Sequence, residues 1–144
     1  MDKRISWNEY FSQVSKLVSS RSPCQRLQVG CVIVKENIIA STGYNGFLPG
    51  APHESIIEDN HELATCHAEM NAIANACRNG INVMNATAYI THYPCINCFK
   101  ILAASGIKNI IYLEDYRNNI HVKTLSEYTN VIIKKYQSHH EDND

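Results

Sequence analysis

Residues 86–113 read ATAYITHYPCINCFKILAASGIKNIIYL, and the order of patterns within this stretch indicates the fold class. Residues 86–91 are typical of a short strand, residues 96–105 of a helix ended by Gly106, and residues 107–113 of a second strand. A strand, a helix and a second strand in succession are typical of a crossover unit with parallel strands. The stretch therefore predicts an α/β fold.

The segments on either side supply the rest of a mixed five-stranded sheet with helices on its faces. Residues 29–34 and 37–43 are β-branched runs separated by Lys35-Glu36, which predicts a hairpin. The connection over 43–66 is long for a structureless loop, so we expect it to be functional or held in place. The other predicted elements are a helix from the Ser6 N-cap to Ser20, an alanine-rich helix at 67–79, a weak helix at 122–127 and a strand at 131–134.

Composition and charge narrow the class of protein. The chain has 144 residues, of which 44% are hydrophobic and 19% charged, so we expect one domain over 1–137 and a polar tail at 138–144. No apolar run approaches the ~20 residues that span a bilayer. Residues 1–8 lack the apolar core of a secretory signal, which predicts a cytoplasmic protein. A net charge of −1 argues against binding polymeric nucleic acid but allows a small anionic substrate.

Two short motifs have the chemistry of a zinc site. The first is His67-Ala68-Glu69, and the second is Pro94-Cys95-Ile96-Asn97-Cys98. One imidazole and two thiolates suit a tetrahedral zinc ion whose fourth position stays open. Cys95 and Cys98 share a helix face and His67 begins another helix, so two positive helix ends are expected to meet at this point. Glu69 is spaced to move protons rather than to bind the metal.

A structural zinc site is the alternative, and it normally has four protein ligands. Cys66 is a poor fourth ligand because adjacent side chains on a helix diverge by ~100°. Cys77 lies off the face that His67 occupies. These residues therefore favour a catalytic zinc with an activated water. Cys31 and Cys77 are interpreted as core thiols, and the expected inward face of the 67–79 helix is Met70, Ile73, Ala74 and Cys77.

Together, the two motifs resemble the zinc site of the cytidine deaminase superfamily. Over about residues 7–117 the chain resembles deoxycytidylate (dCMP) deaminases in particular. The Gly43-Tyr44-Asn45-Gly46-Phe47 segment separates this branch from nucleoside, tRNA and guanine deaminases. The other matching segments are Arg21–Arg26, Val29–Val34, Tyr89–Cys95, Gly106-Ile107-Lys108, Ile111-Tyr112 and Tyr116-Arg117.

The resemblance implies a three-layer α/β/α sandwich and hydrolysis of dCMP to dUMP and ammonia, which supplies dUMP for thymidylate synthesis. In this family the zinc activates the water that attacks C4 of the pyrimidine. Glu69 then protonates N3 and the departing amine. The backbone N–H of Ala68 reads the O2 atom of the base, and the segment before Pro94 lines the base pocket.

The resemblance also assigns residues to the sugar and the phosphate. Asn45 holds the sugar hydroxyl, and Ser22, Arg26 and Tyr116 surround the 5′-phosphate, where an arginine offers bidentate charge. Simpler explanations stand beside these roles. Asn45 between two glycines suits a left-handed turn, Arg26 a surface charge and Tyr116 a packing position. His92 is either a pocket wall or a strand end.

Regulation and assembly follow from the same resemblance. Family members are homo-oligomers, often hexamers, activated by dCTP and inhibited by dTTP with Mg²⁺ at subunit contacts. Tyr44 and Gly46 are the expected effector residues, with Arg78 coupled to them. Some members hold a second, structural zinc in the long loop. The possible donors in this chain are Cys24, His53, His61 and Cys66, or else these are ordinary loop residues, since Pro52-His53-Glu54 stands where the family has Pro-His-Cys.

Three other functions remain as alternatives. A dCMP deaminase that also accepts dCTP fits the same residues. A nucleoside or tRNA deaminase fits less well, because Arg26 and Tyr116 suit a charged substrate and the chain has no basic face. A non-catalytic zinc-binding or nucleotide-binding module is the third alternative, and Glu69 argues against it because a purely structural site does not need that carboxylate.

Overall fold

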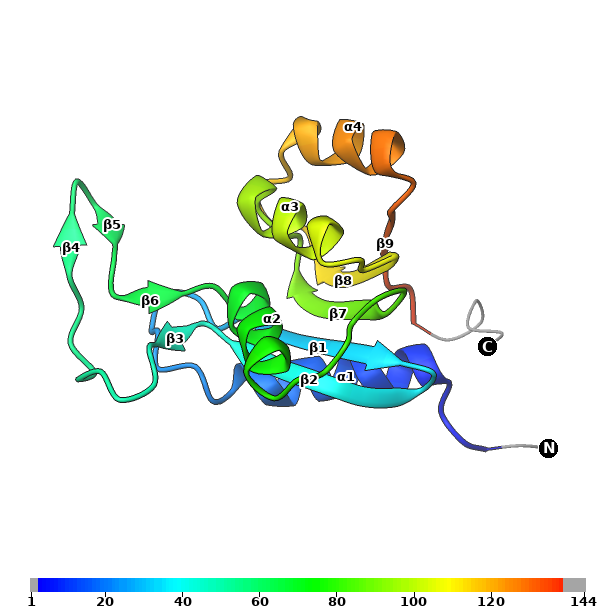
Figure 1. Cartoon of the computed structure of the whole chain (residues 1–144), viewed down its shortest axis with the longest axis horizontal. Coiled ribbons are helices and arrows are strands. Elements are labelled where there is room, and N and C mark those ends of the chain that lie inside the picture. Colours follow the sequence, from blue (N-terminus) through cyan, green and yellow to red (C-terminus); the bar gives the residue numbers. More distant parts are fainter. Residues whose placement is uncertain (1–2, 139–144) are drawn as a thin grey trace.

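The computed structural model describes residues 3–138 and has a mixed five-stranded sheet at its centre (Figure 1). The strand order is β2-β1-β7-β8-β9, in which β1 is antiparallel to β2 and β7, while β7, β8 and β9 are parallel. The predicted α/β fold with this sheet is confirmed. The five strands are β1 (Gly30–Lys35), β2 (Ile38–Tyr44), β7 (Thr87–His92), β8 (Asn109–Glu114) and β9 (Ile132–Lys135).

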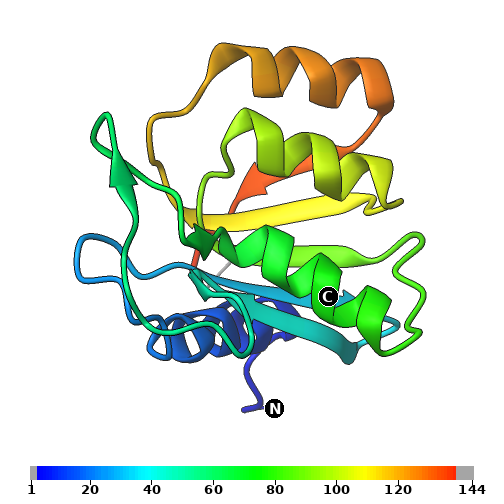
Figure 2. The ribbon, with the colours of Figure 1, turned by 60° about the vertical axis from the view of Figure 1, so that its left-hand side comes forward.

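Helices cover both faces of the sheet and make three layers. Helix α1 lies on one face, and α2, α3 and α4 lie on the other (Figure 2). Side chains alternate between the two faces along each strand, so Val32 and Tyr89 pack with α1 while Ile33 and Ile90 pack beneath α2 and α3. The helices are α1 (Trp7–Ser19), α2 (Ala68–Arg78), α3 (Ile96–Ala104) and α4 (Ile120–Thr129).

Local sequence signals account for several boundaries of these elements. The Ser6 hydroxyl accepts a hydrogen bond from the Glu9 N–H at 3.0 Å, so the predicted N-cap of α1 is confirmed. Glu36 and Asn37 both have positive φ, which suits the two-residue turn between β1 and β2. The sequence placed this turn one residue too early. None of the helices within residues 3–138 is long and apolar enough to cross a membrane.

The long connection before α2 is not structureless. Two small antiparallel pairs form within it, and the second makes a hairpin that extends away from the main sheet (Figure 1). Only Ser138 of the predicted polar tail lies among the described residues. The short strands are β3 (Gly46–Phe47) with β6 (Thr65–Cys66), and β4 (Ile57–Glu58) with β5 (His61–Glu62).

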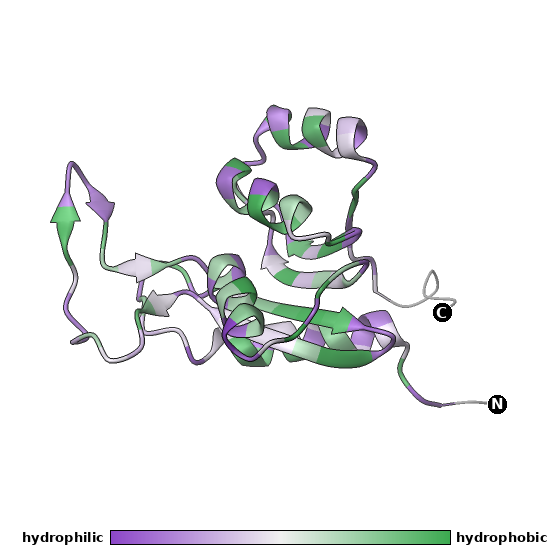
Figure 3. Cartoon of the chain, viewed as in Figure 1, coloured by the Kyte–Doolittle hydropathy of each residue, from purple (hydrophilic) through white to green (hydrophobic). Residues whose placement is uncertain are grey.

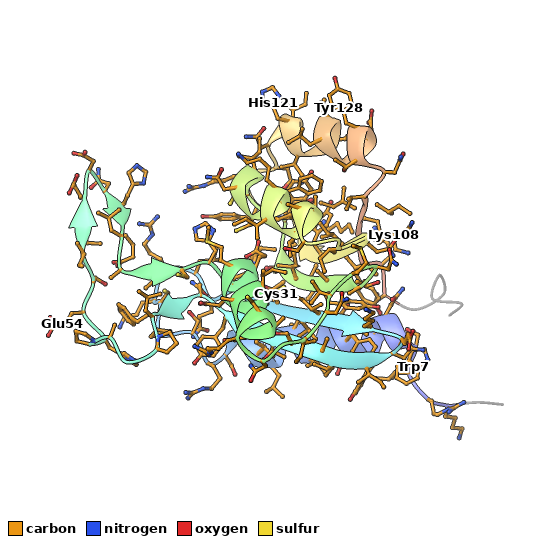
Figure 4. All side chains as sticks on the ribbon, in the orientation of Figure 1. Trp7, Cys31, Glu54, Lys108, His121 and Tyr128 are labelled. Carbon is orange, nitrogen blue, oxygen red and sulfur yellow. The ribbon has the colours of Figure 1, made fainter. Side chains whose placement is uncertain are left out.

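Helix α2 packs through a different face from the one predicted. The structure buries small side chains and Glu69, whereas Ala74 and Cys77 are exposed. The predicted inward face is therefore wrong at Ala74 and Cys77, and so is the core position of Cys77, whereas Ile73 is half-buried and packs against the core as predicted. Cys31, in contrast, is fully buried and lies beside α2 (Figure 4). Its strand, β1, is apolar along most of its length (Figure 3). The buried residues of α2 are Ala68, Glu69, Ala72 and Ala76.

A close approach of α2 to β2 explains this choice of face. A Cβ atom at Gly43 would lie only 2.3 Å from the backbone nitrogen of Ala72, so the helix and the strand touch backbone to backbone. The Ser41 hydroxyl donates to the Ala72 carbonyl at 2.7 Å, and the Asn75 amide donates to the Thr42 carbonyl at 2.9 Å. Only alanine-sized side chains fit between elements held this close.

We therefore expect Gly43→Ala to destabilise the protein by roughly 1–3 kcal/mol, because the added methyl must push α2 away from β2. The midpoint and slope of urea unfolding measure this loss. Thr42→Ala, on the opposite face of the same strand, is the control, and its free energy of unfolding should fall clearly less. An unchanged unfolding midpoint in Gly43→Ala would mean that the approach is looser than the structure indicates.

Candidate metal centre and active site

Three predicted ligands come together where α2 and α3 begin. His67 is the N-cap of α2 and Cys95 the N-cap of α3, while Cys98 lies in the first turn of α3. The Nδ1 atom of His67 lies 3.6 Å from the Sγ of Cys95 and 3.3 Å from the Sγ of Cys98. Both helices begin at the carboxyl end of the parallel strands (Figure 2). Their N-terminal dipoles therefore converge on one point, as predicted.

The geometry of this group fits zinc. Tetrahedral Zn–S and Zn–N bonds of about 2.3 and 2.0 Å place neighbouring ligand atoms about 3.5 Å apart. The two separations measured from His67 are close to that value. No fourth His, Cys, Asp or Glu donor joins the group within residues 3–138, so one position is open to water or substrate. Exposure of His67 beside the buried Cys98 leaves the centre open on one side.

The predicted donors of a second zinc do not assemble. Within the described part of the chain, the only group of three or more donors close enough for a metal is His67, Cys95 and Cys98. The ring of His53 instead stacks on Phe47, with the ring centroids 5.0 Å apart. Within the described residues, the four candidate donors of the loop thus do not form a group that could hold a metal.

Hydrogen bonds within the centre favour a thiolate ligand. A hydrogen bond from Cys98, and after it the contact with His67, lowers the pKa of Cys95 to about 4. The backbone N–H of Cys98 also donates to the Cys95 sulfur at 3.4 Å. The same pairing with Cys95, followed by burial, raises the pKa of Cys98. The hydrogen bond with Cys95 raises the pKa of His67. Cys95 is thus the member of the pair that ionises more readily.

Glu69 is a buried carboxyl group directly behind the ligands. Only 4% of the residue is exposed, and this desolvation raises the pKa of Glu69 to about 7. Its carboxyl group is hydrogen-bonded to Cys98, and its charge adds to burial in raising the pKa of the Cys31 thiol. A carboxyl group that titrates near neutral pH is suited to take up and return a proton during turnover.

Asn45 binds the backbone of the segment before β1. Its Oδ1 atom accepts from the Val29 N–H and its Nδ2 atom donates to the Leu27 carbonyl, both at 2.8 Å. The Ser22 hydroxyl donates to the Asn45 carbonyl at 2.7 Å and accepts from the Cys24 N–H at 3.2 Å. Asn45 does not have positive φ, so the left-handed-turn explanation is wrong. Asn45 and Ser22 thus fix the segment that carries Arg26.

Two of the three residues expected at the phosphate line a cavity together with His92, and the third, Tyr116, lies against the His92 ring. Ser22, Arg26 and His92 line one cavity of about 680 Å³. Tyr116 is 37% exposed, and the centroid of its ring lies 6.0 Å from that of His92 in an edge-to-face arrangement. The guanidinium of Arg117 lies over the Tyr116 ring, 5.1 Å from its centroid. His92 is a pocket wall as well as a strand end.

The expected effector residues do not form one group. Tyr44 lies near the start of α2, where the Asn71 amide donates to its carbonyl at 2.8 Å, and Gly46 follows it in β3. The Arg21 guanidinium lies 5.9 Å from the centroid of the Tyr44 ring. Arg78 is at the opposite end of α2, exposed and hydrogen-bonded to Asn75 within the same helix. Arg78 is connected to β2, the strand that ends at Tyr44, through Asn75, whose amide donates to the Thr42 carbonyl.

Comparison with known proteins shows which class of protein has this fold and this metal centre. Residues 5–114 match the family model described as the cytidine and deoxycytidylate deaminase zinc-binding region. The crystal structure of dCMP deaminase from the cyanophage S-TIM5, in complex with dCMP and dUMP, superposes with a TM-score of 0.81 at 28% identity, covering 89% of this chain and 95% of that one. The fold and the metal centre are thus those of the zinc-binding deaminases.

The family follows from the extent of these matches. The chain belongs to the cytidine and deoxycytidylate deaminase family, and the resemblance expected from the sequence is confirmed. It is 40% identical to ComE operon protein 2 of Bacillus subtilis over 94% of this chain and 74% of that protein. It is 34% identical to deoxycytidylate deaminase of Schizosaccharomyces pombe over 92% of this chain, but it spans only 45% of that enzyme's length.

Proposed function

We propose that this protein deaminates dCMP to dUMP and ammonia with one zinc ion per chain, which would supply dUMP for thymidylate synthesis. The observation that carries the proposal is the buried Glu69 carboxyl group next to an open group of three metal ligands. A structural zinc site has no use for such a carboxyl group. Relatives that carry the name deoxycytidylate deaminase, and the similar cyanophage enzyme with dCMP and dUMP bound, support the choice of substrate.

The chemistry assigns each residue a separate task. His67, Cys95 and Cys98 would hold a zinc ion, which would act as a Lewis acid and lower the pKa of water. Glu69 would accept the first proton of the water and deliver it to N3 of the ring. It would then take the second proton from the hydroxyl group added at C4 and pass it to the amine that leaves. The oxygen of water is thereby added and ammonia is released. The first N–H groups of α2 have no acceptor within the helix, so the N–H of Ala68 would be available to hold O2 of the base.

The remaining substrate contacts are proposed for the cavity beside the sheet edge. Arg26 and Ser22 line it, and Tyr116 packs on its His92 wall, which supports a place for the 5′-phosphate there. Asn45 would hold the sugar hydroxyl, although both ends of its amide already bind backbone. A cavity of this size also gives room for a longer phosphate chain, so dCTP is the alternative substrate.

We further propose a regulated homo-oligomer, a hexamer, that is activated by dCTP and inhibited by dTTP with Mg²⁺ accompanying the triphosphate. Tyr44 and Gly46 would contribute to the effector site because they lie next to the start of α2, which carries His67. All six cysteines are free thiols in the structure, which fits a protein of the reducing cytoplasm.

An ammonia-release assay with the zinc-loaded protein tests this function. We compare dCMP, dCTP, deoxycytidine and CMP, each with and without dCTP or dTTP as effector. The expected result is the highest kcat/KM for dCMP, with dUMP as the product. Higher turnover of deoxycytidine than of dCMP would make the protein a nucleoside deaminase. Absence of turnover on all four substrates would support a non-catalytic module instead.

A further inference from the structure

His92 and Glu114 form a pair at the carboxyl edge of the sheet that the proposed chemistry does not use. They are register partners on the parallel strands β7 and β8, and the Nε2 atom of His92 lies 3.0 Å from the Oε2 atom of Glu114. The Nδ1 atom of His92 lies 2.7 Å from the Thr91 hydroxyl, which also accepts from the Gly30 N–H at 3.1 Å. Both ring nitrogens are therefore engaged, and the Nε2 atom carries the proton that Glu114 accepts.

The pair lies on the side of the sheet that holds the metal ligands. Ala88 and Ile90 belong to the core beneath α2 and α3, and alternation along β7 puts His92 on the same face. Cys95 follows three residues later on the same chain segment. The carboxyl ends of parallel strands are also where ligands bind in open α/β sheets. His92 and the metal ligands thus lie at the same edge of the sheet.

Charge in the adjoining cavity is suited to an anion. Lys16, Arg26 and His92 line it from three different elements, and Glu114 is the one acidic residue among the lining residues. The two members of the pair differ in exposure, since the His92 side chain is 13% exposed and that of Glu114 is 70% exposed. An exposed carboxylate paired with histidine contributes little to stability, so it can turn into solvent while His92 stays fixed by Thr91.

We propose that His92 is a specificity-determining residue for the nucleotide phosphate, and that Glu114 occupies the place of the phosphate until the nucleotide binds. The proposal rests on the proposed function and adds residues to it. A phosphate dianion carries more charge than a carboxylate and has three acceptor oxygens, so it can bind Nε2–H of His92 and the Arg26 guanidinium together. Glu114 thus competes with the phosphate for His92. Replacing His92 should therefore raise KM for dCMP, and replacing Glu114 should lower it.

Steady-state kinetics with dCMP and with deoxycytidine, which lacks the phosphate, measure these effects. His92→Leu should raise KM for dCMP about 10-fold through loss of a charge-assisted hydrogen bond, and leave KM for deoxycytidine within about 2-fold. Glu114→Gln should lower KM for dCMP about 3-fold and leave deoxycytidine unchanged, because a neutral amide competes less with the dianion. His61→Gln and Glu58→Gln are matched controls, because both residues are exposed on the β4–β5 hairpin, which extends away from the sheet, and neither lines this cavity (Figure 1).

The outcomes separate this inference from the proposed function. If the unmodified protein converts dCMP to dUMP, but His92→Leu raises KM for dCMP and for deoxycytidine by the same factor, His92 does not bind the phosphate. If Glu114→Gln raises KM for dCMP, Glu114 orients His92 and is not a competitor, and that half is overturned even where His92→Leu fails to fold. If the unmodified protein prefers deoxycytidine to dCMP, the proposed function itself fails.

Discussion

Replacing Glu69 with glutamine is expected to lower kcat for dCMP by about 10²–10⁴-fold while zinc stays at one ion per chain. Glutamine keeps the shape of the side chain in its buried position but cannot accept or return a proton. Because Glu69 is not one of the three ligands, the metal should be retained. Single-turnover ammonia release, with zinc measured on the same sample, gives both quantities.

An exposed carboxylate provides the control for this experiment. Glu58 lies at the tip of the hairpin that extends from the sheet, so Glu58→Gln should leave kcat unchanged. Turnover in Glu69→Gln within a few fold of the unmodified enzyme would remove Glu69 from the proton transfers. Loss of zinc together with activity would instead give Glu69 a role in holding the metal.

Replacing Cys98 with serine is expected to remove zinc and activity together. Changes to groups that only support metal ligands already cost about 10–100-fold in metal affinity, so loss of a ligand should cost more than 100-fold. The protein should also lose the stabilisation that bound zinc gives the folded state. Zinc content after dialysis and the Tm with and without added zinc measure both effects.

Cys77→Ser is the matched control for that change. Cys77 is exposed on α2 and takes no part in the metal group, so its replacement should leave zinc content and Tm unchanged. A Cys98→Ser protein that binds zinc as tightly as the unmodified protein would contradict the assignment of the ligands.

Sequence patterns predicted the sheet well because each strand is a β-branched or apolar run bounded by turn residues. They failed on the face of α2, where hydrophobicity pointed to Met70 and Ile73. The fully buried face is centred on Ala68, Ala72 and Ala76, with the half-buried Ile73 at its margin, because Gly43 lets β2 approach the helix backbone. The separation of α2 from β2 depends on a tertiary contact between two elements, and the periodicity of one helix does not encode it.

The metal ligands could be predicted because their spacing in the chain and their positions at two helix starts are local features. The His92–Glu114 pair could not, since it depends on the register between β7 and β8 and on no motif in either strand. The double hydrogen bond of Asn45 to Leu27 and Val29 is likewise a contact between segments distant in sequence.

X-ray absorption at the zinc K edge of the purified full-length chain tests the central claim most directly. With the ligands His67, Cys95 and Cys98, the spectrum should show two sulfur neighbours at about 2.3 Å and two nitrogen or oxygen neighbours at about 2.0 Å, one of them exchangeable with solvent. A centre with three sulfur ligands, or with two imidazoles and no exchangeable ligand, would contradict the open catalytic site. So would a chain that binds no zinc.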